Sequence, residues 1–163
     1  MMTILLVDMA VADAAVLASA LRVEGFDVVV TRDANGAREV LASRPVALTI
    51  IDLMIRSEGG ANGLELAREL RDAYPAMRVL LTSSYHLSER QLERADCGVS
   101  GFIPKPYDLR EVVDFVSLKA SSPPSSRRLW CVERPSGIAP RQSALLEEDS
   151  RTVAESAAVA QRR

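Results

Sequence analysis

The stretch RPVALTIIDL, residues 44–53, is an apolar run that follows a proline and ends at an acid. Its central part, VALTII at 46–51, is apolar almost throughout, whereas a strand with one face in water would alternate between apolar and polar residues. Continuous apolar strands of this kind are typical of parallel sheets that helices cover on both faces. The stretch therefore predicts a buried parallel strand that is bounded by Pro45 and by Asp52.

Similar short apolar runs alternate along the chain with longer segments whose apolar residues recur at helical spacing. The predicted strands cover residues 4–7, 27–30, 46–51, 78–82 and 101–103. The predicted helices cover residues 13–25, 35–43, 63–74, 88–96 and 108–119, the last with Asp108 as its candidate N-cap. Five strands alternating with five helices predict a doubly wound α/β domain around a five-stranded parallel sheet.

Length and composition restrict the class of protein. A chain of 163 residues with 48% apolar residues is sufficient for one compact domain. The formal net charge is −2 with acids and bases interspersed, so neither a nucleic-acid surface nor a membrane surface is indicated, and no direct DNA binding is expected. Cys97 and Cys131 lack metal-binding spacing, and no apolar stretch approaches the length of a membrane span. We therefore expect a cytoplasmic protein with reduced thiols.

The composition changes after the last predicted helix. Residues 1–119 form the predicted domain, and residues 120–163 begin SSPPSSRR and continue without a sustained pattern, which predicts a disordered or partly helical tail. Residues 144–163 favour a weak helix with a thin apolar face, which fits either a docking helix or a solvated tail. Trp130, the only tryptophan, lies in the tail sequence RRLWCV and is a candidate anchor of the tail on the domain.

Polar side chains stand where four of the predicted strands end. Asp8 follows the first strand, Asp52 ends the third, Thr82 and Ser83 end the fourth, and Lys105 follows the fifth. The carboxyl ends of parallel strands meet at one edge of an open sheet, where functional crevices lie. Each of these residues alone has an ordinary explanation, such as a helix cap or a solvated side chain. Their coincidence at one edge indicates a functional site.

The sequences ILLVD, TIIDLMI, LLTSSY and GFIPKPYDL resemble the motifs of the receiver domain of bacterial two-component response regulators. The Lys-Pro pair with an aromatic residue three positions before the lysine, together with the aspartate that closes the third strand, makes this resemblance specific. It covers residues 1–119. The resemblance implies a CheY-like fold with strand order 2-1-3-4-5. It also implies a phosphoprotein in phosphorelay signal transduction that is not an enzyme beyond weak self-dephosphorylation.

The resemblance identifies Asp52 as the phosphoacceptor. A carboxylate attacks a phosphoryl group poorly because both are anionic, and Mg²⁺ bound by oxygen ligands normally reduces the repulsion. By similarity, the ligands are Asp8, Asp52 and the main-chain carbonyl of Met54. Lys105 pairs with one phosphoryl oxygen, and the Ser83 hydroxyl donates a hydrogen bond to another.

Ser83 is preferred to Thr82 for this role because its distance in sequence from Lys105 fits the family spacing. In relatives, movement of this hydroxyl toward the phosphate lets an aromatic residue on the fifth strand, here Phe102, turn inward. The change alters the surface formed by the fourth helix, fifth strand and fifth helix. The Lys105–Pro106 peptide bond is cis in relatives.

The sequence departs from the family pattern at several points. Met9 replaces the second acid after the first strand, and a thioether is a poor ligand for a hard cation, so Mg²⁺ affinity is expected to fall. The loop after Asp52 lacks the usual proline and is longer. Glu58 or Asp13 is a candidate replacement ligand, although both also fit solvated side chains. No further folded domain is predicted after the receiver.

Three functional hypotheses follow. The first is a receiver that accepts a phosphoryl group from a histidine kinase or histidine phosphotransfer protein and then binds a downstream protein. Under this hypothesis, a second copy of the chain is a further candidate partner, as a homodimer through the face formed by the fourth helix, fifth strand and fifth helix. The second is a pseudo-receiver interaction module that Met9 has made inefficient in phosphorylation. The third, a flavodoxin-like cofactor binder or small enzyme, is disfavoured because DMAVAD at 8–13 has no phosphate-binding glycines, and the single histidine, His86, is a weak basis for a general base.

Overall fold

The five predicted strands form one parallel sheet in the order β2-β1-β3-β4-β5, so the predicted fold is confirmed. The computed structural model describes residues 1–56, 59–60, 62–85, 87–88, 90–91 and 99–123. The strands are β1 (Thr3–Val7), β2 (Asp27–Thr31), β3 (Leu48–Asp52), β4 (Arg78–Ser83) and β5 (Gly101–Pro104). The helices within these ranges are α1 (Val11–Val23), α2 (Ala34–Ser43), α3 (Gly63–Ala73) and α5 (Leu109–Ser121). No helix of this described part is long and apolar enough to cross a membrane.

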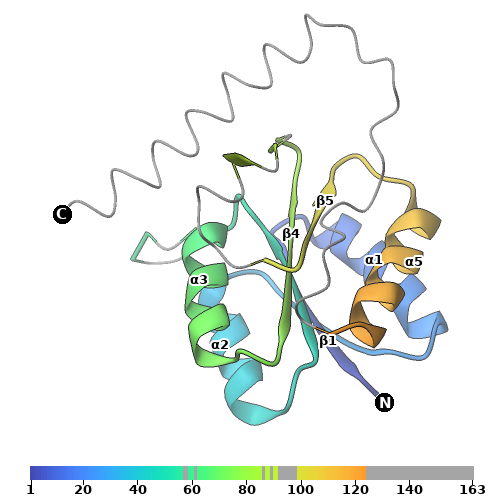
Figure 1. Cartoon of the computed structure of the whole chain (residues 1–163), viewed down its shortest axis with the longest axis horizontal. Helices are drawn as coiled ribbons and strands as arrows, with labels where there is room; N and C mark the ends of the chain where they lie inside the picture. The colour runs from blue at the N-terminus through green and yellow to red at the C-terminus, as the bar shows by residue number, and fades with distance from the viewer. Residues whose placement is uncertain (57–58, 61, 86, 89, 92–98, 124–163) are drawn as a thin grey trace, which may run out of the picture.

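The helices cover both faces of the sheet. Figure 1 shows α1 and α5 together on one side of the strands, and α2 and α3 on the other. Along β1, Ile4 and Leu6 pack in the core on the α1 and α5 side, whereas Leu5 and Val7 pack in the core on the α2 and α3 side. Because successive side chains of a strand point to opposite faces, both faces of β1 are buried, which explains its continuous apolar sequence.

Three helices begin at side-chain caps, which fix where each helix starts. The Asp33 carboxylate accepts a hydrogen bond from the amide of Gly36 at the start of α2. Asn62 and Glu65 form a reciprocal capping box at the start of α3. The predicted cap Asp108 accepts hydrogen bonds from two amides of the first turn of α5, so that prediction is confirmed.

The observed elements differ from the predicted ones mainly at their ends. The helix predicted at 13–25 spans Val11–Val23, and it ends before Gly25 because this residue, with a φ of 93°, lies outside helical geometry. The strand predicted from residue 46 begins in the sheet ladder at Leu48. The predicted fourth helix lies mostly outside the described residues. Also outside them are the predictions for the tail, His86, Cys97 and Glu58.

Candidate functional site

The register of the parallel ladders places the predicted site residues of β3, β4 and β5 beside one another. Asp52, the last residue of β3, pairs with Thr82 in β4. Ser83, the last residue of β4, pairs with Pro104, which directly precedes Lys105. The backbone amide of Lys105 also donates a hydrogen bond to the carbonyl of Ser83 over 2.8 Å. The ladder therefore continues as far as the residue that carries the predicted ammonium group.

Asp8 reaches the same edge from β1, and its carboxylate is oriented by local backbone. The amide of Asp8 donates to the carbonyl of Thr31 over 3.0 Å, which continues the pairing of β1 with β2. Its Oδ1 accepts a hydrogen bond from the amide of Ala10 at 2.8 Å. Asp52 is held in the same way, because its Oδ1 accepts from the amide of Met54 at 2.7 Å. Each carboxylate therefore has one oxygen fixed by the amide two residues later.

Lys105 joins the two carboxylates. Its Nζ lies 2.8 Å from Oδ2 of Asp8 and 2.7 Å from Oδ2 of Asp52. The three side chains are only 12–13% exposed, so water screens these charge-assisted contacts weakly. One ammonium against two carboxylates leaves the cluster with an excess of negative charge. The structure thus brings together three of the predicted site residues.

The ammonium of Lys105 stays protonated in this environment. Burial alone lowers the pKa of Lys105, but hydrogen bonds to Asp52 and Asp8 and the attraction of both carboxylates raise that pKa above its ordinary value of 10.5. The Lys105–Pro106 peptide bond is cis, as the resemblance implied. The lysine is therefore a permanent cation at neutral pH, positioned by β5 and held by two acids.

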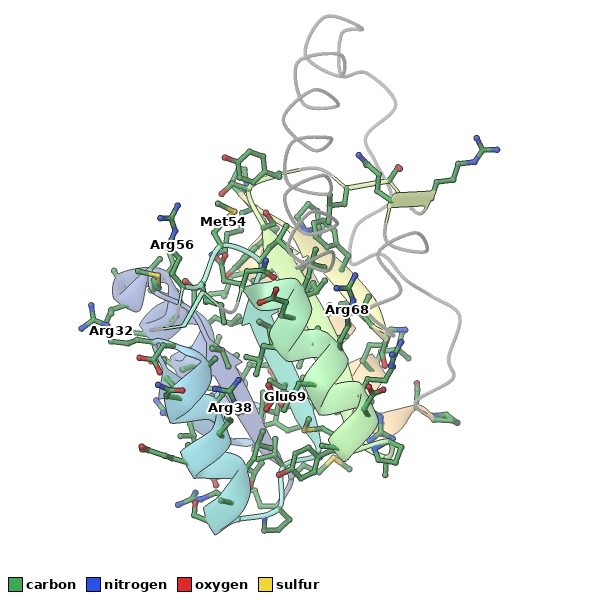
Figure 2. The ribbon with its side chains drawn as sticks, turned by 90° about the vertical axis from the view of Figure 1, so that its left-hand side faces the viewer. Arg32, Arg38, Met54, Arg56, Arg68 and Glu69 are labelled. Carbon is green, nitrogen blue, oxygen red and sulfur yellow. The ribbon has the colours of Figure 1, made fainter. Side chains whose placement is uncertain are left out.

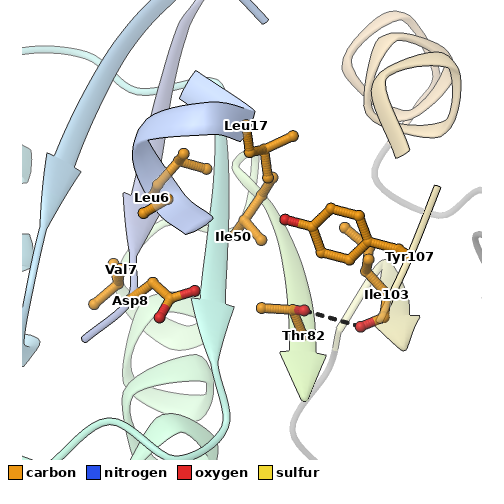
Figure 3. Close-up of a pocket in the computed structure, with 9 residues that line it drawn as sticks. Leu6, Val7, Asp8, Leu17, Ile50, Thr82, Ile103 and Tyr107 are labelled. Carbon is orange, nitrogen blue, oxygen red and sulfur yellow. Dashed lines mark hydrogen bonds between the residues drawn. The ribbon is translucent and has the colours of Figure 1, made fainter. Parts of the chain in front are cut away.

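The two candidate hydroxyls on β4 have different partners. Thr82 donates its hydroxyl proton to the carbonyl of Ile103 at 2.9 Å (Figure 3). It lines a small cavity together with Asp8, Tyr107 and apolar side chains, most of which belong to the core on the α1 and α5 side (Figure 3). Ser83 is fully buried, and its hydroxyl oxygen accepts a hydrogen bond from the amide of Tyr85 at 3.0 Å. The Thr82 proton is already committed to a carbonyl, whereas the Ser83 contact uses only an oxygen lone pair.

Phe102, the predicted switch residue, is fully buried in the core on the α2 and α3 side. Its neighbour Ile103 is buried in the core on the opposite face. The aromatic ring of Phe102 is therefore inside the domain in this structure, and its backbone pairs with Leu81 in the β4–β5 ladder. Its role as a switch stays a prediction.

The position of the missing second acid is open to solvent. Met9 directly follows Asp8 and is 51% exposed. Asp13, one of the two candidate replacements, is also exposed and lies in the first turn of α1. The part of the chain that the structure describes contains no group of three or more side chains of histidine, cysteine, aspartate or glutamate suited to one metal ion. Asp13 therefore does not complete a cluster with Asp8 and Asp52.

The donor atoms at this edge nevertheless fit a hard divalent cation. Asp8 and Asp52 provide carboxylate oxygens, and Met54, which carries the predicted main-chain carbonyl ligand, is held to Asp52 through its amide. Oxygen donors of this type suit Mg²⁺, which also retains several water ligands. The set holds one carboxylate fewer than the family pattern, and Lys105 already contacts one oxygen of each acid.

Gly63 is a supporting residue that the sequence did not single out. It begins α3, and a Cβ atom added to it would lie 2.5 Å from the carbonyl oxygen of Asp52 and 2.7 Å from Cα of Leu53. Only glycine allows this approach, so the start of α3 packs directly against the backbone of Asp52. The loop that connects β3 to α3 begins with the segment that carries Met54 and Arg56 (Figure 2). The feature of the sequence that could have identified Gly63 is its position directly after Asn62, the residue that caps α3.

This sheet, with two acids and a lysine at its carboxyl edge, defines the molecule as a CheY-like α/β domain. Residues 4–117 match the family model described as the response regulator receiver domain. The chain belongs to the response regulator receiver domain family.

Curated and solved relatives agree with this assignment. The TorCAD operon transcriptional regulatory protein TorR of Escherichia coli O157:H7 is 33% identical over 90 residues, which are 55% of this chain and 37% of that protein. The DNA-binding transcriptional regulator NtrC of Azospirillum brasilense is 30% identical over 126 residues, 76% of this chain and 26% of that protein. A CheY-like receiver domain protein from Methanospirillum hungatei JF-1 has the same fold, with a TM-score of 0.66, 21% identity, and coverage of 74% of this chain and 94% of that chain.

The chain spans less than two fifths of the length of these two curated relatives. Their names describe transcriptional regulators, one of them DNA-binding, and those names refer to the whole proteins. The expectation that this chain does not bind DNA directly is therefore not supported by these relatives and stays a prediction.

Proposed function

We propose that this receiver accepts a phosphoryl group on Asp52 from a histidine kinase or a histidine phosphotransfer protein, and that its phosphorylated form binds a downstream protein. The observation that carries the proposal is the ammonium of Lys105 between the carboxylates of Asp8 and Asp52, at 2.8 and 2.7 Å. These residues are the ones that the family uses for phosphoryl transfer, and they meet at the edge where doubly wound sheets bind ligands.

The reaction would be an in-line transfer. An oxygen of Asp52 attacks the phosphorus of a phosphohistidine, an O–P bond forms, and the N–P bond breaks with its electron pair returning to the imidazole. Lys105 is proposed to pair with a phosphoryl oxygen, which is supported by the distance of 2.7 Å between its Nζ and Oδ2 of the acceptor. Ser83 is proposed to donate its hydroxyl proton to a second phosphoryl oxygen, which is supported by the prior engagement of Thr82 with Ile103.

Mg²⁺ is the proposed cofactor, and Asp8, Asp52 and the main-chain carbonyl of Met54 are its proposed ligands. When bound, it would offset the negative charge that builds up between the acceptor and the phosphoryl group. The chain itself is proposed to act as a phosphoacceptor rather than an enzyme, with slow self-dephosphorylation at most. The role of Phe102 as the switch residue belongs to the same proposal.

The alternative is a pseudo-receiver that binds partners without efficient phosphorylation. It is favoured by the exposed Met9 at the position of a metal-binding acid. Lys105 also supplies a cation to both remaining carboxylates, so the acidic edge is partly neutralised without any metal. Under this hypothesis, a partner would recognise a single state of the surface.

Incubation with acetyl phosphate and Mg²⁺ separates the two functions. The proposal predicts a mass increase of one phosphoryl group on the wild type that requires Mg²⁺ and is lost in Asp52→Asn. Asp72→Asn is the matched control, because Asp72 is an exposed acid on α3 whose partner is Arg71 rather than the site. Absence of an Mg²⁺-dependent aspartyl phosphate, with beryllofluoride also failing to bind, would favour the pseudo-receiver.

A further inference from the structure

A groove lies at the amino-terminal end of the sheet, away from the acidic edge. It is lined by residues 41–47, between α2 and β3, and by residues 74–78, between α3 and β4. Its volume is about 770 Å³. Because β3 and β4 both begin at these loops and end at the site, the groove and Asp52 are on opposite ends of the same strands.

The surface of this groove is mainly apolar. Leu41 and Met77 are buried at 8% and 7% exposure, and Tyr74 is 39% exposed. Further lining residues that are exposed and carry apolar side chains are Ala42, Pro45, Pro75 and Ala76. An aromatic ring flanked by exposed prolines and alanines offers a flat apolar surface for an apolar segment.

The last helix of the domain ends at the rim of this groove. Arg78 lines the groove, and its Nε donates a hydrogen bond to the carbonyl of Ser122 at 2.6 Å. The Nη2 group of Arg78 donates to the same carbonyl. Ser122 is the C-cap of α5, so this bidentate contact fixes the exit point of the chain beside the groove. The described residues end one position later, at Pro123.

We propose that the tail segment Leu129–Val132, with the sequence LWCV, binds in this groove of its own domain. Trp130 is the only tryptophan, and LWCV is an unbroken apolar run between polar and charged residues of the tail. Trp130 lies eight positions after Ser122 in the sequence. At about 3.3 Å per residue this stretch reaches about 26 Å, which is sufficient to lay the segment along the groove. Tethering to the rim gives the segment an effective concentration in the millimolar range, so a modest apolar contact holds it.

This inference is independent of phosphorylation at Asp52. It assigns a binding partner to the surface at the opposite end of the sheet, and the partner is a segment of the same chain. The segment is short enough, and its tether close enough, that binding within one molecule is favoured over binding to a second copy at low protein concentration.

Fluorescence of Trp130 tests the proposal in the full chain. We expect the emission of the wild type to be shifted to shorter wavelength and protected from acrylamide, and both effects to be lost in Ala42→Arg, which places a charged side chain in the groove. Ala15→Arg is the matched control, since Ala15 is also an exposed helical alanine but lies on α1. Circular dichroism shows whether each variant remains folded. Solvent-exposed tryptophan emission in the folded wild type would overturn the proposal.

Disulfide trapping gives a second measurement that does not depend on blocking the groove. In a Cys97→Ser background, Ala42→Cys should form a disulfide with Cys131 under mild oxidation, because the segment brings the two Cα atoms within the required range of about 4.4–6.8 Å. Ala15→Cys should not form it. A bond only between two chains would instead assign the groove to a second copy, and no bond at all would refute the docking.

Discussion

The Nζ atom of Lys105 lies 2.7 Å from Oδ2 of Asp52, so the cation that follows β5 directly contacts the acid that ends β3. The same Nζ lies 2.8 Å from Oδ2 of Asp8. A divalent cation that uses these two acids must therefore share them with the lysine. Competition between the Lys105 ammonium and a divalent cation for these carboxylates therefore determines how tightly the metal binds.

Replacing the lysine should make the fold more dependent on metal. Lys105→Met leaves two carboxylates of 12–13% exposure without their cation, and we expect a loss of about 2 kcal/mol in the free energy of unfolding. Added Mg²⁺ should raise the melting temperature more in this variant than in the wild type. Differential scanning fluorimetry measures both, with Arg44→Met, which breaks an exposed ion pair, as the control. Equal Mg²⁺ effects in all three proteins would contradict competition between the two cations.

The two adjacent hydroxyls of β4 should have separable roles. Ser83→Ala should weaken beryllofluoride binding by about tenfold, the value of one hydrogen bond to a charged group. Thr82→Val should leave that affinity unchanged but lower the free energy of unfolding by about 1 kcal/mol, because the carbonyl of Ile103 loses a buried donor. Titration calorimetry and chemical denaturation distinguish the variants. The reverse pattern would assign the phosphate-binding hydroxyl to Thr82.

Restoring the second acid should strengthen the metal site. Met9 is 51% exposed, so Met9→Asp adds a carboxylate beside Asp8 without leaving a cavity in the core. We expect Mg²⁺ to bind about tenfold more tightly, because its affinity for an oxygen site depends on ligand charge and number. Titration calorimetry measures the change, with Met9→Leu as the control that keeps an apolar side chain. An affinity unchanged by Met9→Asp would mean that another group already fills this ligand position.

The sequence was sufficient to predict the fold because its strongest patterns are local. The continuous apolar strands, the prolines and the cap Asp108 each act over a few residues, and the parallel sheet follows from their alternation. Asp8, Asp52 and Lys105 could be placed at one edge because the carboxyl ends of parallel strands coincide. The topology explains why these residues meet, and the amides of Ala10 and Met54 orient the two carboxylates locally.

Other features required three-dimensional contacts. The sequence spacing already favoured Ser83 over Thr82, but the hydrogen bond from the Thr82 hydroxyl to the carbonyl of Ile103 is a contact across strands that the sequence could not show. The need for Gly63 comes from the backbone of Asp52, which is distant along the loop but 2.5 Å from where a Cβ atom would lie. The groove between 41–47 and 74–78 is formed by two loops whose sequences give no sign of their proximity.

The ion pair between α2 and α3 should stabilise the domain in a pH-dependent manner. Arg38 donates from Nε and Nη2 to the two oxygens of Glu69 at 2.8 and 2.7 Å, and Figure 2 shows the two side chains facing each other. The hydrogen bond to Arg38 lowers the pKa of Glu69 below its ordinary value of 4.5, against a smaller opposing effect of burial. A lowered pKa in the folded state means that this stabilisation is complete above pH 4.5 and is lost as the pH falls through the folded-state value.

A double-mutant cycle with Arg38→Ala and Glu69→Ala measures the effect. The side chains are 41% and 43% exposed, so the coupling at pH 7 should be below about 1 kcal/mol, and it should vanish in strong acid. The pair of Arg44 with Asp27 is the control, because it has a single contact at 3.2 Å and should couple more weakly. If the Arg38–Glu69 coupling were the same at pH 7 and in strong acid, the contact would depend on packing of the side chains rather than on the charge of Glu69.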